Sequence, residues 1–355
     1  MNRTDKIRRK LDGAGLDALM ITSETNRRYA VGFHSSAGVI LITKSKTFFL
    51  TDGRYIEAAR ASVKSAEVIS VSGSAAVNDL LCGIIKDNSI RTLGYEEGRM
   101  TCREYLKRRS SLPADLVPAE DILSGMRESK DEDEIDCIRK AQKTAESAFE
   151  RVLRIIKPGI TEKETAAELV YLMLKDGAEK PSFDPIVLSG AKTSVPHGEP
   201  GPKAIEKGDF VLMDFGCSVN GYKSDMTRTV AVGGVTEKQA GIYDVVLRAQ
   251  LEGISAAKAG VPGKEPDAAA RRVIENAGYG EFFCHGFGHG TGLEVHETPS
   301  LSQDETKALA PGCIVTAEPG IYIPKEFGVR IEDMLLITEA GPQNLTKAPK
   351  NLIVL

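Results

Sequence analysis

Two aspartates in an apolar part of the chain are the first residues whose types and spacing suggest chemistry. Asp214 lies inside the apolar segment 210–216, which is typical of a buried strand, and Asp225 follows soon after it. A carboxylate buried without a partner is strongly unfavourable, so Asp214 requires a cation or several hydrogen-bond donors. The alternative is a pair of surface aspartates on an exposed hairpin. The apolar residues on the other face of this strand argue against that alternative.

The residues between the two aspartates predict how close they lie. The dipeptide Asn-Gly at 220–221 is a typical two-residue hairpin turn, and it places Asp214 opposite Thr227 in the returning strand. The same register places Gly216 opposite Asp225, where the missing side chain would leave room for an ion. Asp214 and Asp225 then become diagonal neighbours about 5–8 Å apart. Two carboxylates on one face repel unless a cation lies between them, so the hairpin predicts a cation site.

A glycine-rich segment, residues 284–292, contributes two histidines. Strand alternation places His285 and His289 on one face and glycines on the other, where a second backbone can approach closely. A phosphate-binding loop is the other interpretation, but the spacing matches neither G-x-G-x-x-G nor a P-loop. One histidine satisfied within the core would be the ordinary alternative, yet a third, His296, follows closely. The segment therefore predicts metal-binding or proton-carrying imidazoles.

Two glutamates extend the pattern. Glu318 ends an apolar strand just before a Pro-Gly turn, and Glu332 lies two residues after Arg330 on another predicted strand. A plain ion pair between Arg330 and Glu332 would also explain the second segment. Neither glutamate is specific alone, so their meaning depends on the aspartates and histidines described above.

Together these residues have the composition of a dinuclear metal site. Four carboxylates carry a charge that two divalent cations would neutralise. Oxygen-rich ligands with one nitrogen suit Mn²⁺, Co²⁺ or Fe²⁺, whereas structural zinc sites are typically rich in thiolates. Two metals about 3.5–4 Å apart can bridge a hydroxide nucleophile and hold a carbonyl oxygen. The set comprises Asp214, Asp225, Glu318, Glu332 and one imidazole.

The elements that must position this set divide the 355-residue chain into two parts. Residues 1–125 alternate short apolar segments with amphipathic ones, which predicts an α/β domain. The strands are expected at 17–23, 38–43, 47–53, 66–72 and 92–96, and the helices at 4–12, 54–62, 76–87 and 102–110. A charged stretch then leads into a long helical pattern, so we place the second domain at residues 126–355. A capping box from Thr161 to Glu164 predicts the start of a further helix.

Composition and charge exclude several classes of protein. Lys and Arg number 46 and Asp and Glu 50, which gives a net charge of −4 and no general attraction to nucleic acid. We expect no membrane association, because no apolar run is long enough to span a bilayer. The charged N-terminus lacks an export signal, which predicts a cytoplasmic protein. The six cysteines include no C-x-x-C pair, so reduced thiols are expected.

The site motifs resemble those of the pita-bread metallopeptidases, a family that includes methionine aminopeptidase, aminopeptidase P and prolidase. The resemblance covers nearly the whole chain and rests on MDFG, SDMTRT, GHGTGLEVHE, TAEPGIY and VRIEDM. It implies an α+β pita-bread catalytic domain that follows an α/β domain similar to the creatinase N-terminal domain. It implies two divalent metal ions, with Mn²⁺ expected and Co²⁺, Fe²⁺ and Zn²⁺ as alternatives. The implied ligands are Asp214, Asp225, His289, Glu318 and Glu332.

The same resemblance implies roles for four residues around the ligands. His197, His285 and His296 fall on histidines that bind substrate and relay protons around the leaving nitrogen. Arg330 matches a supporting arginine of the proline-specific members. These four are therefore the expected catalytic residues.

The N-terminal domain distinguishes the subgroups of the family. Methionine aminopeptidases usually lack it, and creatinase lacks the full ligand set, so proline-containing peptides cleaved at Xaa-Pro bonds are the implied substrates. Dipeptidase-type members often carry an arginine shortly after the His296 motif, where this chain has Ser300. This departure favours an aminopeptidase P type, with prolidase as the alternative.

Two further expectations concern partners. The resemblance implies a homodimer, in which the loop that contains His34 either stays exposed or reaches the partner's active site. A non-catalytic binding module is the remote alternative to an enzyme. Relatives of that kind typically lose metal ligands and gain charged extensions, and this sequence has done neither.

Overall fold

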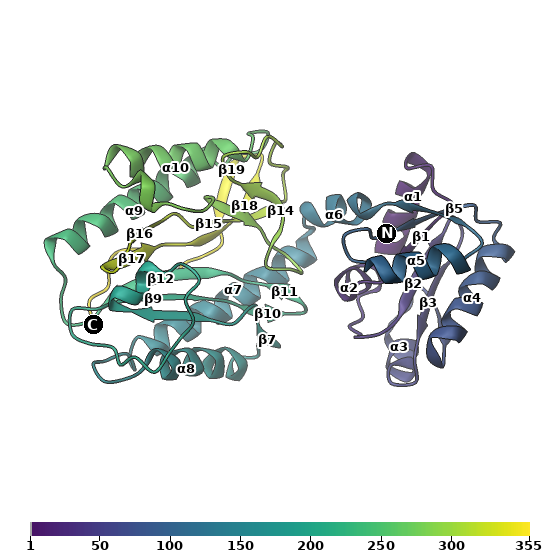
Figure 1. The fold of residues 1–355 in the computed structure, drawn as a ribbon, viewed down its shortest axis with the longest axis horizontal. Helices are drawn as coiled ribbons and strands as arrows, with labels where there is room; N and C mark the ends of the chain where they lie inside the picture. The colour runs from purple at the N-terminus through teal and green to yellow at the C-terminus, as the bar shows by residue number, and fades with distance from the viewer. Residues whose placement is uncertain (1) are drawn as a thin grey trace. The chain divides into compact units, whose positions relative to one another are not determined.

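The computed structural model describes residues 2–355 and divides into two compact units between Met126 and Arg127 (Figure 1). One helix, α6, runs across this division. The boundary that we place between residues 125 and 126 stays a prediction about where two domains separate. None of the helices in residues 2–355 is long and apolar enough to cross a membrane.

The first unit contains a mixed β-sheet in the order β4-β3-β2-β1-β5-β6. Its centre is an antiparallel meander of β1, β2 and β3, while β4, β5 and β6 are added in parallel at the two sides. The strands are β1 Ala18–Ile21, β2 Val39–Thr43, β3 Thr47–Thr51, β4 Glu67–Ser70, β5 Thr92–Tyr95 and β6 Asp115–Pro118. The five predicted strands are confirmed, and β6 was missed.

Helices pack on this sheet, as expected for an α/β domain. They are α1 Arg3–Gly13, α2 Glu24–Val31, α3 Ile56–Ser62, α4 Gly73–Asp87, α5 Cys102–Ser111 and α6 Glu120–Glu128. The sequence predicted α1, α3, α4 and α5 but not α2 or α6. The reason is clear in α2, which buries the polar residues Asn26 and Arg27 beside Tyr29 and Ala30 and so lacks an apolar stripe.

The second unit begins with two helices that carry matching N-terminal caps. The helices of this unit are α7 Glu132–Val152, α8 Glu162–Lys175, α9 Glu237–Ala256 and α10 Lys264–Asn276, with short 3-10 helices η1 Gly190–Ser194 and η2 Gly280–Phe282. Thr161 caps α8, and the Glu164 side chain accepts a hydrogen bond from the Thr161 amide at 2.8 Å. The predicted capping box is therefore confirmed, and α7 carries an equivalent box at Asp131 and Glu134.

The strands of the second unit form several small sheets between the helices. They are β7 Lys180–Pro181, β8 Ile186–Ser189, β9 Phe210–Phe215, β10 Cys217–Val219, β11 Tyr222–Lys223, β12 Met226–Ala231, β13 Gly288–Gly290, β14 Glu297–Leu301, β15 Ile314–Ala317, β16 Gly320–Ile323, β17 Phe327–Arg330, β18 Asp333–Thr338 and β19 Gly341–Asn344. The sheet orders are β11-β10-β7, β12-β9-β8, β14-β13-β15-β18-β19 and β16-β17.

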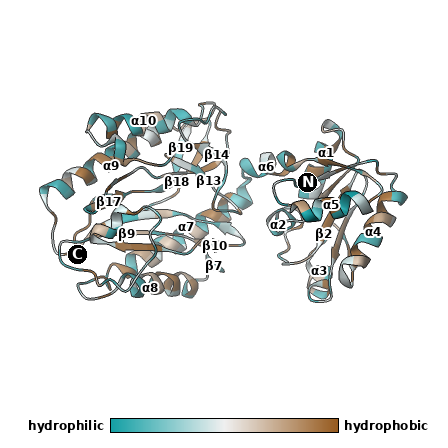
Figure 2. Ribbon diagram, viewed as in Figure 1, coloured by the Kyte–Doolittle hydropathy of each residue, from teal (hydrophilic) through white to brown (hydrophobic). Residues whose placement is uncertain are grey.

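These strands lie between two pairs of helices, with α7 and α8 on one side and α9 and α10 on the other (Figure 1). Phe149 of α7 packs with Phe215 of β9 in one core, and Phe287 packs with Val246 of α9 in the other. Figure 2 shows the hydrophobic stretches of β9 and α8 that build the first core. This is the predicted α+β pita-bread architecture, and the strands between its helices carry the site.

Candidate metal centre and active site

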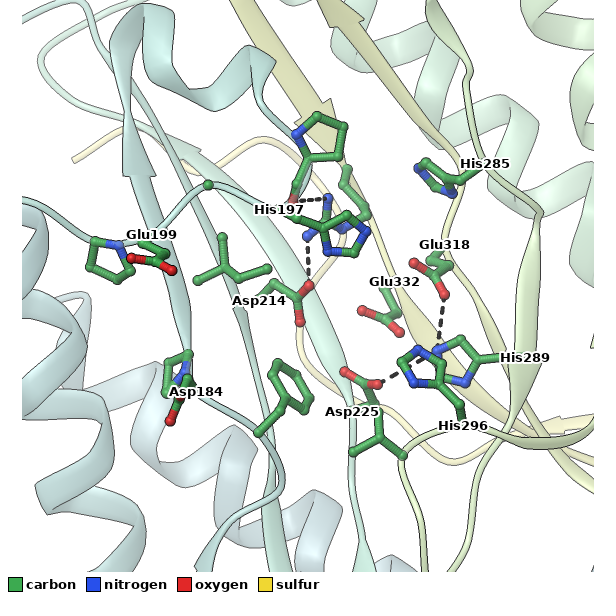
Figure 3. Close-up of a pocket in the computed structure, with 18 of the residues that line it drawn as sticks. Asp184, His197, Glu199, Asp214, Asp225, His285, His289, His296, Glu318 and Glu332 are labelled. Atoms are coloured by element: carbon green, nitrogen blue, oxygen red, sulfur yellow. Dashed lines mark hydrogen bonds and ion pairs between the residues drawn. The ribbon is translucent and has the colours of Figure 1, made fainter. Parts of the chain in front are cut away.

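All nine predicted site residues line one cleft of about 970 Å³ in the second unit. Figure 3 shows the metal-ligand candidates converging from separate strands and loops on the middle of this cleft. The residues are Asp214, Asp225, His289, Glu318 and Glu332, together with His197, His285, His296 and Arg330.

The hairpin that carries the two aspartates has the predicted register. Asp214 on β9 pairs with Thr227 on β12, and the turn at 220–221 has positive φ angles at both residues, as a two-residue hairpin requires. One expectation was wrong. A side chain at Gly216 would lie 1.9 Å from the carbonyl oxygen of Ser224, so backbone, not an ion, fills the space beside Gly216.

The glycines beside His289 allow a second backbone to approach closely, as predicted. A side chain at Gly288 would lie 2.0 Å from the carbonyl oxygen of Thr316, and one at Gly290 would lie 2.5 Å from that of Thr298. Neighbouring backbone therefore approaches β13 from both sides. This close packing fixes the position of His289 between two strands, β14 and β15.

Three candidate ligands already form a compact group. One atom each from Asp225, His289 and Glu332 lies within 4.8 Å of the other two. Glu318 joins them, because its Oε1 lies 3.2 Å from Nε2 of His289. Asp225 and Glu332 are almost completely buried, so water screens their charges weakly.

The ring of His289 is oriented to offer Nε2 to these carboxylates. Its Nδ1 lies 3.1 Å from the carbonyl oxygen of Gly290, and that contact requires a proton on Nδ1. Nε2 then faces Glu318 and, at 3.8 Å, Asp225. In the protein alone a second proton stabilises this arrangement: burial opposes the charge, but the hydrogen bond to Glu318 raises the pKa of His289 to about 9.

The carboxylates behave as a crowded set of like charges. Burial and the neighbouring Asp214 raise the pKa of Asp225 well above its ordinary value, and burial and Asp225 do the same to the pKa of Glu332. Glu318 differs, because the hydrogen bond and charge of His289 outweigh its burial and hold its pKa near 2. The protein alone therefore cannot keep all four groups ionised without a compensating cation.

Asp214 gives an independent indication of a missing partner. Its Oδ2 accepts a hydrogen bond from Nη2 of Arg330 at 2.6 Å, whereas Oδ1 is buried and has no hydrogen-bond partner within residues 2–355. A buried carboxylate oxygen without a donor is rare and unfavourable. The oxygen-rich donor set and this open position both fit divalent cations bound between the carboxylates.

The Arg330–Glu332 ion pair considered from the sequence is wrong. Arg330 pairs with Asp214, while Oε2 of Glu332 accepts a hydrogen bond from the hydroxyl of Thr227 at 2.7 Å. Nε of Arg330 donates to the same hydroxyl at 3.1 Å. Thr227 thus links the arginine to a ligand candidate.

Tyr322 is a site residue that the sequence analysis missed. Its hydroxyl lies 2.8 Å from both Nη1 of Arg330 and Nε2 of His285, and Nδ1 of His285 lies 2.8 Å from the carbonyl oxygen of Gly286. The directions follow from the chemistry: Arg330 donates to Tyr322, which donates to His285, which donates to Gly286. Only the motif TAEPGIY could have indicated this tyrosine.

The remaining histidines lie on loops beside the ligands. The rings of His296 and His289 are 4.3 Å apart, and burial lowers the pKa of His296. His197 follows η1 on a segment that lines the cleft. Neither His197 nor His296 forms a side-chain hydrogen bond within residues 2–355, so both can face a ligand.

Two other residues singled out from the sequence are not ligand candidates, and only one of them lines the cleft. His34 belongs to the first unit, where its half-exposed ring lies 3.2 Å from Oε1 of Glu24. Ser300 lines the cleft on β14, and its hydroxyl lies 3.1 Å from that of Ser302.

All six cysteines are free of disulfides, as expected from the sequence.

Comparison with known proteins identifies both parts of the chain. Residues 136–339 match the metallopeptidase family M24, and residues 3–129 match the creatinase/prolidase N-terminal domain. An Xaa-Pro dipeptidase from Pyrococcus horikoshii is 40% identical over 99% of this chain and 98% of its own length.

Solved structures show a similarity over nearly the whole chain as well. An Xaa-Pro dipeptidase from Bacillus anthracis is 42% identical, covers 99% of both chains and has a TM-score of 0.96. An X-Pro aminopeptidase from Thermotoga maritima is 36% identical, covers both chains completely and has a TM-score of 0.94. With its cleft of clustered carboxylates and histidines, this chain belongs to the metallopeptidase family M24 and carries the N-terminal domain of creatinases and prolidases.

Proposed function

We propose that this protein is a prolidase, which hydrolyses the peptide bond of Xaa-Pro dipeptides. The observation that carries the proposal is the convergence of the four ligand-candidate carboxylates and four histidines on one cleft, with a buried oxygen of Asp214 that has no hydrogen-bond donor within residues 2–355. The similarity to Xaa-Pro dipeptidases at 40–42% identity over nearly the whole chain supports the choice of substrate.

We further propose two Mn²⁺ ions as the cofactor. When bound, such cations lower the pKa of a water molecule and polarise the scissile carbonyl group. The proposed ligands are Asp214, Asp225, His289, Glu318 and Glu332. Exhaustive chelation should abolish turnover, and added Mn²⁺ should restore it at two equivalents per chain. Full activity after chelation would exclude this cofactor.

The surrounding residues would orient the substrate and move its protons. His285 is engaged at both ring nitrogens by Tyr322 and Gly286, so we assign it a fixed position beside the carbonyl group. The ring nitrogens of His197 and His296 form no hydrogen bond within residues 2–355, so these histidines can carry a proton to the prolyl nitrogen as it leaves. Arg330 holds Asp214 in place through their ion pair.

Ser300 supports a second candidate function, an aminopeptidase P activity on longer peptides. A dipeptide presents its carboxylate on the proline itself and benefits from a cationic anchor, which a serine cannot supply. The X-Pro aminopeptidase from Thermotoga maritima is also similar over the whole chain. The dipeptidase relatives nevertheless give prolidase more support than the aminopeptidase P type that Ser300 led us to prefer.

A direct comparison of substrates tests the proposal. The Mn²⁺-loaded protein should hydrolyse Ala-Pro with a higher kcat/KM than Ala-Pro-Ala, and it should leave Met-Ala-Ala uncut. A tenfold preference for the tripeptide would identify an aminopeptidase P instead. Cleavage of Met-Ala-Ala without activity on either proline peptide would exclude both functions.

Three further properties of the protein are proposed with this function: its domain boundary, its oligomeric state and its location. A separable domain boundary at residues 125/126 is tested by expressing residues 126–355 alone, and a homodimer is tested by sedimentation velocity. We also propose a cytoplasmic location, which six cysteines without disulfides support because disulfides form in oxidising compartments. Cell fractionation tests that location.

A further inference from the structure

The carboxylate of Glu162, at the start of α8, is completely buried and serves residues outside its own helix. Its Oε1 accepts hydrogen bonds from the backbone amide of Ser189 at 2.8 Å and from the Ser189 hydroxyl at 3.1 Å. Its Oε2 accepts from Nζ of Lys192 at 2.7 Å and from the amide of Gly201 at 3.0 Å. The Glu162 side chain thus binds Ser189 and Gly201, the two ends of one segment of the chain.

The residues between these points form the 189–201 segment, which carries His197. Nζ of Lys192 also donates to the carbonyl oxygen of Glu199 at 2.6 Å, so the lysine links Glu162 to the part of the segment next to His197. The backbone adds a further tie, from the amide of Lys163 to the carbonyl oxygen of Gly201 at 3.1 Å. Glu162 therefore closes the 189–201 segment into a loop at its base.

The other side of the loop meets the metal-ligand candidates. Nη1 of Arg330 lies 3.4 Å from the carbonyl oxygen of Pro196, the residue before His197, while Nη2 of Arg330 holds Asp214. The loop is thus held between Glu162 at its base and Arg330 at its tip. Displacement at the base would move His197 relative to Asp214.

We propose that Glu162 is a positioning residue for catalysis, which fixes the 189–201 segment so that His197 faces the reacting peptide. This inference rests on the proposed function, because His197 matters only if a substrate binds in the cleft. An ordinary acidic residue in the first helical turn interacts with its own helix. The four hydrogen bonds that the Glu162 side chain accepts within residues 2–355 all come from the 189–201 segment, which indicates a different purpose.

The variant Glu162→Gln tests this purpose with little change in size. A Gln side chain keeps one acceptor oxygen, but its amide group faces either the Ser189 donors or those of Lys192 and Gly201, so one end of the loop is released. A misplaced catalytic group can lower the rate by about 100-fold. We expect kcat for Ala-Pro to fall about 10- to 100-fold, with KM and metal content within about threefold of wild type.

Two comparisons separate positioning from a general structural effect. The control Glu164→Gln changes an exposed glutamate in the same helical turn, whose side chain accepts hydrogen bonds within residues 2–355 from Thr161 alone. It should leave kcat within about twofold of wild type. The double variant Glu162→Gln with His197→Ala should be about as slow as His197→Ala alone, because the two act through one imidazole. Multiplicative losses, or a normal kcat in Glu162→Gln, would overturn the inference.

Further measurements keep the result interpretable. Should Glu162→Gln fail to fold by circular dichroism, Lys192→Met removes the half-exposed partner instead and should show the same dependence on His197.

Should the wild type cleave no proline peptide, the proposed function fails while the loop remains testable by hydrogen exchange. Amides in 189–201 should then exchange at least tenfold faster in Glu162→Gln than in Glu164→Gln, and equal rates would refute the role of Glu162.

Discussion

Nε2 of His289 lies 3.2 Å from Oε1 of Glu318, and the other ring nitrogen is held by the carbonyl oxygen of Gly290. The imidazole therefore cannot turn away from the carboxylates without losing its backbone contact. The same nitrogen that carries a proton in the protein alone is the one that would bind a metal ion. The site is thus arranged for a cation at this position.

Replacement of Asp225 by Asn should have opposite effects on stability with and without metal. In the metal-free protein the change replaces a carboxyl group whose charged form is disfavoured by burial and by Asp214, so the Tm should rise by about 2–4 °C. With Mn²⁺ the same change removes a ligand charge, so the metal-induced increase in Tm should shrink and turnover should fall by orders of magnitude. Differential scanning fluorimetry with and without chelator measures the two effects.

The matched control for this prediction is Asp244→Asn, which changes an exposed aspartate that pairs with Arg248 on α9. It should behave as the wild type in both conditions. Near-normal turnover by Asp225→Asn with two bound metals would exclude Asp225 as an essential ligand.

Replacement of His296 by Ala should lower turnover more than it lowers metal content. Its ring lies beside that of His289, but within residues 2–355 neither of its ring nitrogens forms a hydrogen bond with a carboxylate of the site. We expect kcat to fall about 100- to 10,000-fold, as is typical when a proton-transfer group is lost. Metal analysis of the purified variant decides the matter, since loss of a whole equivalent would make His296 a ligand.

The local parts of this site were predictable because short-range geometry determines them. The Asn-Gly turn at 220–221 fixed the pairing of Asp214 with Thr227, and the capping box fixed the start of α8. Such features depend on a few neighbouring residues and on backbone conformations that only certain residue types adopt. The convergence of the separate segments was instead inferred from the charge of the four carboxylates, and the family resemblance identified His289 as the imidazole ligand.

The parts that were missed depend on contacts between distant segments. Tyr322 joins His285 to Arg330, and Glu162 joins Ser189 to Gly201, but neither side chain has a local pattern that reveals its partner. Space for an ion was assigned beside Gly216 because this residue lies opposite Asp225 and has no side chain, but the backbone of Ser224 fills that space. Tertiary packing, which alternation rules do not describe, decided these cases.

The glycine at 288 should tolerate no side chain, because a Cβ atom there would lie 2.0 Å from the carbonyl oxygen of Thr316. Gly288→Ala should therefore destabilise the second unit by about 3 kcal/mol or more, as overpacking against rigid backbone does. Gly241→Ala is the control, since a Cβ atom there would meet nothing within 4 Å among residues 2–355 apart from the neighbouring backbone of α9. It should be neutral or stabilising by up to about 1 kcal/mol. Urea denaturation of both variants measures the difference.

Asp17 should contribute acid-sensitive stability to the first unit. Hydrogen bonds from the amides of Thr92 and Arg91 lower its pKa to about 2. A depressed carboxyl pKa stabilises the fold above the unfolded value near 4, and this contribution is lost as the pH falls toward 2. Because the side chain is one-third exposed, we expect Asp17→Asn to cost only about 1 kcal/mol at pH 7.

Urea midpoints measured from pH 7 to pH 2 check this dependence. The difference between wild type and Asp17→Asn should shrink as the pH falls below 4, whereas Asp12→Asn, at a mostly exposed aspartate, should change little at any pH. A difference that stays constant across this range would contradict the role given to Asp17.

Ser300 offers a way to change the substrate preference. It pairs directly with His289 across β13 and β14 and lines the cleft, so an arginine at this position would reach the bound peptide. A charge-assisted hydrogen bond to the prolyl carboxylate is worth about 1.5–3 kcal/mol, which corresponds to about a 10- to 150-fold change. Ser300→Arg should therefore raise kcat/KM for Ala-Pro relative to Ala-Pro-amide, which lacks that carboxylate. The control Ser300→Ala removes the hydroxyl contact with Ser302 and should leave the ratio of the two kcat/KM values unchanged. An equal change for both substrates in Ser300→Arg would show that position 300 does not contact the carboxylate.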